Sequence, residues 1–452
     1  MVTSAVGAQA PRVPDANNTT GVDSTALSRI VVRCMLCGKQ FDGSALRTSC
    51  TDCGGLLDVL IPLQRLSPSD IGASTPAAGR HSGVWRYAPL LPRLPEEALV
   101  SRWEGNTPLY RDDRLARFAG LREGDLELKH EGHNPTGSFK DRGMTVGISH
   151  AKAVGARIVA CASTGNTSAS LASYAGAAGI PALVLVPQTK ISAGKIAQTI
   201  AYGAKVVQID GDFDRALALL RQLTDAYDVY LVNSVNPFRL EGQKTIIFEM
   251  LEQRGWQPPD WIALPGGNLG NTAAFGKALV ELRQAGLIPR LPRLAVIQAK
   301  GAAPFAAYFE TGFEEYAPVQ AETVATAIKI GDPASIARAR RSIDATYGCV
   351  TTVSDDEILE AKAAIDAAGI GCEPASAASL AGLRRLTREG VVRPGETAVA
   401  VLTGHLLKDT DAITAYHFDD VDNAPRPGAN RPLRVAAELP ALERALADAL
   451  HG

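Results

Sequence analysis

The segment 134–144, Asn-Pro-Thr-Gly-Ser-Phe-Lys-Asp-Arg-Gly-Met, contains a lysine whose surroundings suit a nucleophilic amine. Small and hydroxylated residues precede Lys140, and the segment after it has little side-chain bulk. A lysine nucleophile needs a lowered pKa and room for a flat, phosphorylated aldehyde, and such surroundings can provide both. Alone, the segment only suggests this chemistry, and three later motifs make it specific.

The second motif, Ser-Thr-Gly-Asn-Thr-Ser at 163–168, follows the apolar run 158–162 and precedes an alanine-rich stretch. This pattern is typical of a strand, a tight turn and a helix. Backbone N–H groups at such a turn face whatever docks over the helix start. Asn166 could bond the ring hydroxyl of a cofactor, and Ser163 and Thr167 could hold a carboxylate or phosphate. A helix cap without a ligand explains the motif about equally well.

The third motif is Pro-Gly-Gly-Asn-Leu-Gly-Asn-Thr at 265–272, after the apolar run 261–264. Closely spaced glycines let the backbone approach a phosphate, and successive N–H groups with a helix dipole can hold the dianion. The spacing matches neither the dinucleotide fingerprint nor the Walker A pattern, so a nucleotide is the weaker interpretation. A glycine-rich turn without a ligand is the alternative.

The fourth motif, Val-Leu-Thr-Gly-His at 401–405, is an apolar strand that ends in a hydroxyl and a glycine. Open α/β sheets bind their ligands at the carboxyl ends of strands. Thr403 could exchange a hydrogen bond with a pyridine nitrogen, which need not be protonated when its partner is a neutral hydroxyl. An ordinary strand-to-loop connection without a ligand is the alternative interpretation of this motif. Together, the four motifs predict that Lys140 carries pyridoxal phosphate as a Schiff base.

In this order the motifs resemble those of the fold-type-II pyridoxal-phosphate enzymes, and within them the threonine synthases. The resemblance extends over about residues 104–409. Further matching segments lie at 104–109, 233–245, 326–331, 371–379 and 403–409. The run Asn-Pro-Phe-Arg-Leu-Glu-Gly-Gln-Lys-Thr at 236–245 is the most specific, because it separates threonine synthases from the dehydratases and cysteine synthases that share the fold.

The resemblance implies a set of site residues. Lys140 would be catalytic, and the cofactor contacts would come from Lys140, Asn166, Gly267, Asn268, Leu269, Gly270, Asn271 and Thr403. The substrate contacts would come from Ser163, Thr164, Thr167, Asn233, Ser234 and Arg239. Arg239 presents a fork of donors that suits phosphate, although a lone arginine after an apolar run is more often solvated or salt-bridged.

The implied reaction is the last step of threonine biosynthesis, in which O-phospho-L-homoserine and water give L-threonine and phosphate by γ-elimination and β-addition. A related lyase, such as a cysteate synthase acting on O-phosphoserine, is one alternative. A threonine or serine dehydratase is another, but it has no need of a second phosphate receptor. A non-catalytic relative is disfavoured because Lys140, Asn166 and Thr403 are all present.

Two Cys-x-x-Cys pairs near the N-terminus predict a metal site. Cys34 and Cys37 are separated by 12 residues from Cys50 and Cys53. Four thiolates at this spacing can surround one Zn²⁺ tetrahedrally, which leaves no open position for water and makes the site structural. Disulfides and an unmetallated ribbon are the alternatives.

Composition limits the class of protein. The 452 residues carry a net charge of −2, with 46% hydrophobic and 21% charged residues, as in soluble globular proteins. This balance does not favour a nucleic acid or a membrane as partner, and no apolar run is long enough to span a bilayer. The small-molecule substrate is therefore the expected partner. The cytoplasm is the default location, and the resemblance is compatible with a homodimer or a monomer.

Short apolar runs alternate with amphipathic segments from about residue 125 to 401, which predicts parallel βαβ units. The expected architecture is α/β, with two doubly wound parallel-sheet domains of the tryptophan synthase beta-like type and an N-terminal zinc-ribbon-like segment. The predicted boundaries are a disordered tail at 1–28, the ribbon at 29–65, a linker with the start of the large domain at 66–124, a smaller mobile domain at 125–238, a large cofactor-binding domain at 239–420, and a linker and helix at 421–452.

Overall fold

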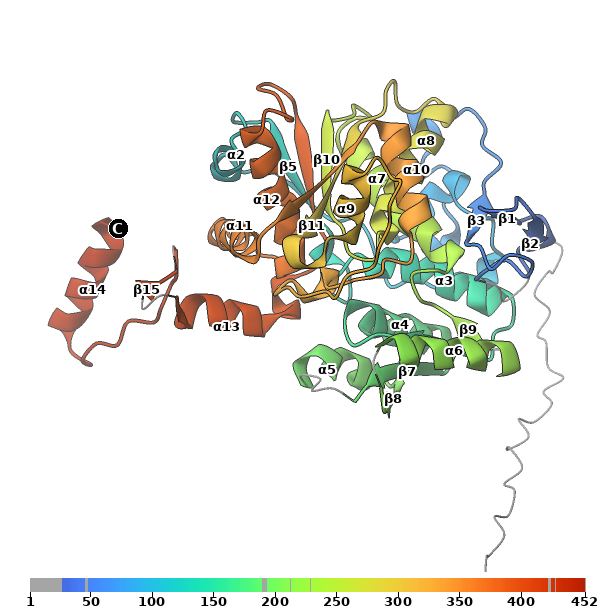
Figure 1. Ribbon diagram of the computed structural model, residues 1–452, viewed down its shortest axis with the longest axis horizontal. Coiled ribbons are helices and arrows are strands. Elements are labelled where there is room, and N and C mark those ends of the chain that lie inside the picture. Colours follow the sequence, from blue (N-terminus) through green and yellow to red (C-terminus); the bar gives the residue numbers. More distant parts are fainter. Residues whose placement is uncertain are drawn as a thin grey trace, which may run out of the picture.

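The computed structural model describes residues 27–44, 48–188, 193–211, 213–227, 229–421, 424–426 and 428–451. Within these ranges, a six-stranded and a four-stranded sheet, each flanked by helices, form the body (Figure 1). A three-stranded sheet lies near the N-terminus. The predicted tail falls almost entirely outside the described residues.

The six-stranded sheet has the order β12-β11-β10-β13-β5-β4, and its pairs are parallel except β4 with β5. Its strands are β4 (Leu109–Tyr110), β5 (Leu126–His130), β10 (Trp261–Pro265), β11 (Arg293–Ala299), β12 (Cys349–Val353) and β13 (Ala398–Leu402). Its central strands are buried on both faces, which agrees with their nearly continuous apolar sequences.

Helices cover both faces of this sheet, so each face has its own apolar core. One core includes residues of α7 (Pro237–Gln253), α8 (Gly270–Ala285), α9 (Pro304–Glu310) and α10 (Ile336–Thr346). The other includes residues of α2 (Asp113–Ala119), α11 (Asp355–Ala367) and α12 (Pro374–Arg388).

The four-stranded sheet is parallel throughout, with the order β8-β7-β6-β9. Its strands are β6 (Ile158–Ala162), β7 (Ala182–Pro187), β8 (Lys205–Ile209) and β9 (Val229–Leu231), and its helices are α4 (Asn166–Ala178), α5 (Ala193–Ala201) and α6 (Phe213–Tyr227). Helix α3 (Lys140–Ala153) packs between this unit and α7 of the larger one. The predicted α/β fold with two wound parallel sheets is confirmed.

One predicted boundary needs correction. The segment 126–130 falls in the predicted smaller domain, yet it forms β5 and pairs with β13 in the larger sheet. The smaller sheet begins only at β6, so a start at residue 125 is too early. Apolar runs predict strands, but they do not say which of two parallel sheets a strand joins.

The N-terminal sheet is antiparallel and consists of β1 (Val31–Cys34), β2 (Gln40–Asp42) and β3 (Leu57–Leu60). The arm that follows includes the short 3₁₀ helices η1 (Pro68–Asp70), η2 (Ala77–Gly79), η3 (Trp85–Leu90) and η4 (Glu96–Ala98). Trp85 is buried, shares a core with Val146 of α3 and Phe238 of α7, and donates its indole N–H to Thr145 at 3.0 Å. The arm therefore braces the two helices that carry the predicted lysine and arginine.

The C-terminal part extends to one side of the body (Figure 1). It contains α13 (Thr410–Phe418), the hairpin β14 (Asp420–Val421) with β15 (Ala424–Pro425), and α14 (Leu439–His451). Among the described residues, no helix combines the length and apolar character that a bilayer crossing requires.

Candidate active site

Lys140 is the first residue of α3, and the loop before it is bound to the loop after β13. The Phe139 N–H donates to the carbonyl oxygen of Thr403 at 3.0 Å, and the His405 N–H donates to that of Gly137 at 2.9 Å. Ser138 and Gly404 form an antiparallel bridge between these bonds. The first and fourth motifs, which are distant in sequence, therefore lie against each other.

The environment of Lys140 favours its neutral amine. The side chain is partly buried, and Nζ lies 3.8 Å from the centre of the Phe139 ring. Burial, together with the positive charge of Arg239 and against the opposing effect of the Glu373 carboxylate, lowers the pKa of Lys140 to about 7. A neutral amine is the form that attacks an aldehyde or removes a proton.

Arg239 reaches this environment because α3 and α7 pack closely. A Cβ atom at Gly242 would lie 1.9 Å from the carbonyl oxygen of Arg142, and one at Gly147 would lie 3.0 Å from Cγ of Arg239. Asn236 caps α7 by accepting N–H bonds from Phe238 and Arg239. Arg239 thus lies in the first turn of a capped helix, facing α3.

The Arg239 guanidinium is buried without an acidic partner among the described residues. Its Nη1 donates to the carbonyl oxygen of Val232 at 3.0 Å, while Nε is buried without an acceptor. Burial lowers the pKa of Arg239 to about 10. A buried cation without a counter-ion is costly, and a bound anion would remove that cost.

The glycine-rich segment forms the turn between β10 and α8. Leu269 has φ +61°, and a Cβ atom at Gly267 would lie 3.1 Å from Cα of Ile328, so the turn is tight and closely covered. In the first turn of α8, Asn271 Oδ1 and Thr272 Oγ1 are buried without partners. A phosphate bound at this helix start would meet free N–H and hydroxyl groups.

Thr403 and Asn166 converge on Glu373, at the start of α12. The Asn166 amide donates to Glu373 Oε2 at 3.0 Å, and the Thr403 hydroxyl donates to Oε1 at 3.3 Å. Burial raises the pKa of Glu373. Gly404 has no room for a side chain, because a Cβ atom there would lie 2.5 Å from the Glu373 carboxyl carbon. The predicted ring contacts from the two units are thus brought together.

The remaining predicted substrate residues lie around the ends of β6 and β9. Ser163, Thr164 and Thr167 are partly buried at the β6–α4 turn. The Asn233 amide accepts from the Ala162 N–H and donates to the Ala162 carbonyl oxygen, both at 3.1 Å, which leaves one amide N–H for another partner. Asn233 therefore also fixes the end of β6 against the segment after β9.

Ser234 and Asn268 join the two segments that are candidates for binding phosphate, which are the glycine-rich turn and the segment that leads to Arg239. The Asn268 amide donates to the Ser234 hydroxyl at 2.9 Å, and its carbonyl oxygen accepts from the Ala334 N–H at 2.7 Å. The glycine-rich turn is therefore tied to the segment that leads into α7.

The residues fit pyridoxal phosphate. Five buried polar atoms near the predicted contacts have no partner among the described residues, namely Ser138 Oγ, Arg239 Nε, Gln243 Oε1, Asn271 Oδ1 and Thr272 Oγ1. Native proteins leave few such atoms unpaired. A phosphorylated ligand would accept bonds from Ser138, Arg239 and Thr272, whereas the two amide oxygens would need a donor group.

Comparison with known proteins identifies the family. Residues 100–404 match the family model described as pyridoxal-phosphate dependent enzyme. The threonine synthase of Methanocaldococcus jannaschii is 43% identical over 418 residues, which cover 92% of this chain and 99% of that protein. The threonine synthase of Methanosarcina acetivorans is 46% identical over 386 residues, covering 84% and 93% of the two chains.

The chain belongs to the threonine synthases. The crystal structure of the threonine synthase from Escherichia coli covers 93% of this chain and 100% of its own, with a TM-score of 0.66 and 18% identity, and supports the shared fold. The predicted family, its pyridoxal-phosphate chemistry and its fold are confirmed.

The four cysteines predicted as ligands also come together in this threonine synthase family member. Their sulfur atoms all lie within 4.8 Å of one another, with 3.4 Å between Cys34 and Cys53 and 3.6 Å between Cys37 and Cys50. Tetrahedral zinc with Zn–S bonds of about 2.3 Å needs sulfurs about 3.8 Å apart. The donor set and its compactness fit zinc.

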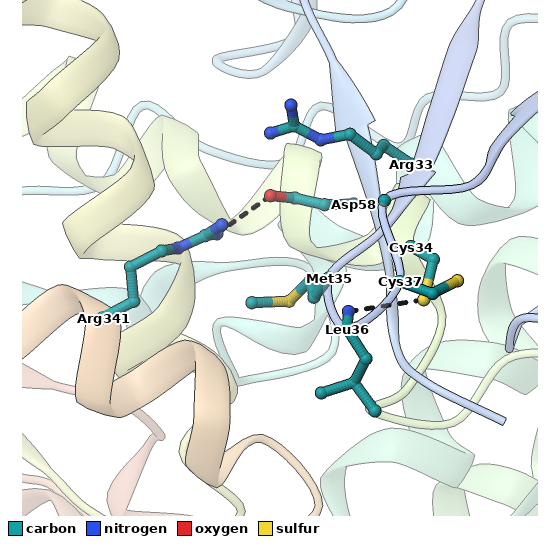
Figure 2. A pocket seen from close by; sticks show the side chains of 8 residues that line it. Arg33, Cys34, Met35, Leu36, Cys37, Asp58 and Arg341 are labelled. Atoms are coloured by element: carbon teal, nitrogen blue, oxygen red, sulfur yellow. Dashed lines mark hydrogen bonds and ion pairs between the residues drawn. The ribbon is translucent and has the colours of Figure 1, made fainter. Parts of the chain in front are cut away.

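Figure 2 shows how the ribbon adjoins the large domain beside this cysteine cluster. Asp58 of β3 accepts from Arg341 at 2.9 Å and from Lys277 of α8 at 3.0 Å. Lys277 also pairs with Glu241 of α7. The ribbon is therefore joined by buried charges to the two helices that begin at the Arg239 and glycine-rich segments.

Two residues of the site were not predicted. Glu373 and Ser376 belong to the segment 371–379, which matches the family, but their residue types gave no role for them. An acid and a serine at the start of a helix are typical of helix capping, so the pattern alone could not distinguish them from structural residues.

Proposed function

We propose that the protein is a threonine synthase that converts O-phospho-L-homoserine and water into L-threonine and phosphate. The observation that carries the assignment of roles is the buried Arg239, which has no carboxylate partner within the part of the chain that the structure describes and faces the helix of Lys140. The reaction is that of the family. The polar groups around Lys140 would bind the cofactor, and those around Arg239 would bind the departing phosphate.

Each residue then has a physical task. Bound pyridoxal phosphate would supply an electron sink that withdraws negative charge from the substrate Cα. Asn166 would bond the ring hydroxyl, Thr403 the ring nitrogen, and the turn at 267–271 the cofactor phosphate. Lys140 Nζ, with its pKa near 7, would take the proton from the substrate Cα and return protons later.

Arg239 would bind the substrate phosphate and hold it as it leaves, with Ser163, Thr164, Thr167, Asn233 and Ser234 around it. A charged, forked donor in a buried site binds phosphate strongly and in a defined orientation. Water must be excluded until the addition step, because early hydrolysis would release a keto acid. Contacts across the two units, such as Asn166 with Glu373 and Gln198 with Lys408, support closure of the smaller domain around the substrate.

A substrate comparison tests this function. We expect the purified protein, loaded with pyridoxal phosphate, to release threonine and phosphate in equal amounts from O-phospho-L-homoserine. O-phosphoserine should give no phosphate, and threonine should give little keto acid. Phosphate release from phosphoserine in preference would favour the cysteate synthase alternative, and rapid keto acid formation from threonine would favour a dehydratase.

The lowered pKa of Lys140 predicts a pH dependence for loading the apo-protein. Raising the pH converts the ammonium to the reactive amine, so the rate of pyridoxal phosphate binding should rise through about pH 7 and then level off. Arg239→Gln removes a positive charge that lowers this pKa, so the midpoint should move upward. Arg117→Gln, at an exposed ion pair, is the control and should leave it unchanged. Absorbance stopped-flow measures the rate, and a wild-type midpoint near pH 10 would contradict the assignment.

We also propose that Cys34, Cys37, Cys50 and Cys53 hold one structural zinc ion. Elemental analysis should find about one zinc per chain. Cys50→Ser should lose most of it and lower the melting temperature, by roughly 1 °C for each kcal/mol lost in a chain of 452 residues. Cys349→Ser, outside the ribbon, should retain the metal. Full zinc content in Cys50→Ser would contradict the site. The cytoplasmic location and the homodimer stay predictions.

A further inference from the structure

Ser376 occupies a position that controls the hydroxyl proton of Thr403. It lies buried in the first turn of α12. Its Oγ accepts the N–H of Thr403 at 2.8 Å and the N–H of Gly404 at 3.0 Å, and it lies 2.9 Å from Thr403 Oγ1. Three bonds thus join one serine to the turn that ends β13.

The hydrogen bonds around Ser376 Oγ determine which hydroxyl donates in the bond between Ser376 and Thr403. A serine hydroxyl has one proton and two lone pairs. The two backbone N–H groups fill both lone pairs, so only the proton remains for a further bond. The Gly404 carbonyl oxygen is 3.5 Å away, at the limit of a hydrogen bond, whereas Thr403 Oγ1 is at 2.9 Å. Ser376 therefore donates to Thr403.

Thr403 must then direct its own proton away from Ser376. The acceptor in reach of Thr403 Oγ1 is Glu373 Oε1 at 3.3 Å, which is longer than a typical bond between oxygens. The Glu373 carboxylate already accepts from Asn166 at 3.0 Å. The Thr403 hydroxyl is therefore held as a donor by its bond from Ser376 and is only weakly held by its present acceptor.

We propose that Ser376 is a positioning residue that makes Thr403 a hydrogen-bond donor to the ring nitrogen of the cofactor, which keeps that nitrogen unprotonated. This inference rests on the proposed function, in which Thr403 faces the ring nitrogen. An unprotonated ring withdraws electrons more weakly than a pyridinium does. Ser376 would thus set the strength of the electron sink without touching the cofactor.

In the alternative arrangement, Thr403 donates its proton to Glu373. Its oxygen then accepts a hydrogen bond from a protonated ring nitrogen of the cofactor. The two arrangements differ in the charge of the ring and in the role of Glu373. Under the proposal, Glu373→Gln leaves the ring nitrogen unprotonated. Under the alternative, Glu373→Gln removes the carboxylate acceptor on which the pyridinium arrangement depends.

The test is ¹⁵N NMR of the protein loaded with pyridoxal phosphate labelled at its ring nitrogen, which reports protonation directly. We expect the wild type to give the resonance of a neutral, hydrogen-bonded pyridine. Ser376→Ala should move the resonance toward that of a pyridine without a donor and lower kcat about tenfold with little change in KM. Ser376→Thr keeps the hydroxyl, so its resonance and kcat should be those of the wild type. Ser376→Cys has a weak donor, so its resonance and kcat should lie between those of Ser376→Ala and the wild type.

Ser379→Ala is the matched control, because this serine lies on the same helix and donates to the Ser376 carbonyl oxygen at 2.8 Å without reaching Thr403. It should leave the resonance unchanged. Thr403→Val should shift the resonance, and adding Ser376→Ala to it should cause no further shift. A pyridinium resonance in the wild type would overturn the role of Ser376. So would a Ser376→Ala protein with the wild-type resonance when Thr403→Val shifts that resonance. An unaltered Thr403→Val protein would instead remove the proposed ring contact of Thr403.

Discussion

Lys140→Ala should abolish threonine formation, with a fall in kcat of about 10⁴-fold or more. The reason is that one amine has two tasks, because it holds the cofactor and then moves the substrate protons, and covalent and acid–base contributions of one group are lost together. The lowered pKa of this amine makes it competent for both at neutral pH. Phosphate release from O-phospho-L-homoserine measures the effect.

The matched control is Lys152→Ala, at the last turn of the same helix, which should retain wild-type turnover. A small primary amine added to the Lys140→Ala protein should restore part of the activity, because the fold and Arg239 remain intact. Wild-type turnover by Lys140→Ala would contradict the catalytic role of this lysine.

Arg239→Gln should have the second-largest effect, lowering kcat/KM for O-phospho-L-homoserine by on the order of 10²–10³-fold. Removing one partner of a buried, charge-assisted contact costs roughly 2–5 kcal/mol, and about 1.4 kcal/mol corresponds to a factor of ten. Arg239→Lys keeps the charge but loses the planar fork, so it should lie between glutamine and the wild type.

The stability of the Arg239→Gln protein separates binding from folding. In the described structure the guanidinium is buried with one backbone acceptor and no carboxylate partner, so replacing it should leave the free energy of unfolding unchanged or higher. Inorganic phosphate should stabilise the wild type against heat and the variant much less. A strongly destabilised variant that binds phosphate as tightly as the wild type would assign Arg239 a structural role.

Much of the fold and site follows from short patterns in the sequence. Glycine and hydroxyl residues after apolar runs predicted the turns that follow β6, β10 and β13, because a strand, a tight turn and a helix start leave a local pattern in the sequence. The cysteine spacing predicted a cluster whose sulfurs do lie together. In both cases the pattern that carries the prediction lies within a short stretch of the chain.

Other features depend on contacts that no local pattern contains. Strand β5 joins the larger sheet through pairing with β13, more than 260 residues later. The lack of an acid beside Arg239 among the described residues and the donor direction imposed by Ser376 arise from the packing of α7 and α12. Asn233 was predicted as a substrate contact, but its bonds to Ala162 became visible only in the fold.

The most direct measurement of the central claim is peptide mapping by mass spectrometry after borohydride reduction of the pyridoxal-phosphate-loaded protein. Reduction fixes the cofactor to the amine that holds it. We predict one modified peptide, with the added mass on Lys140 and none on Lys129, Lys152 or Lys408. A cofactor mapped to another lysine, or a loaded protein that yields no adduct, would contradict the account.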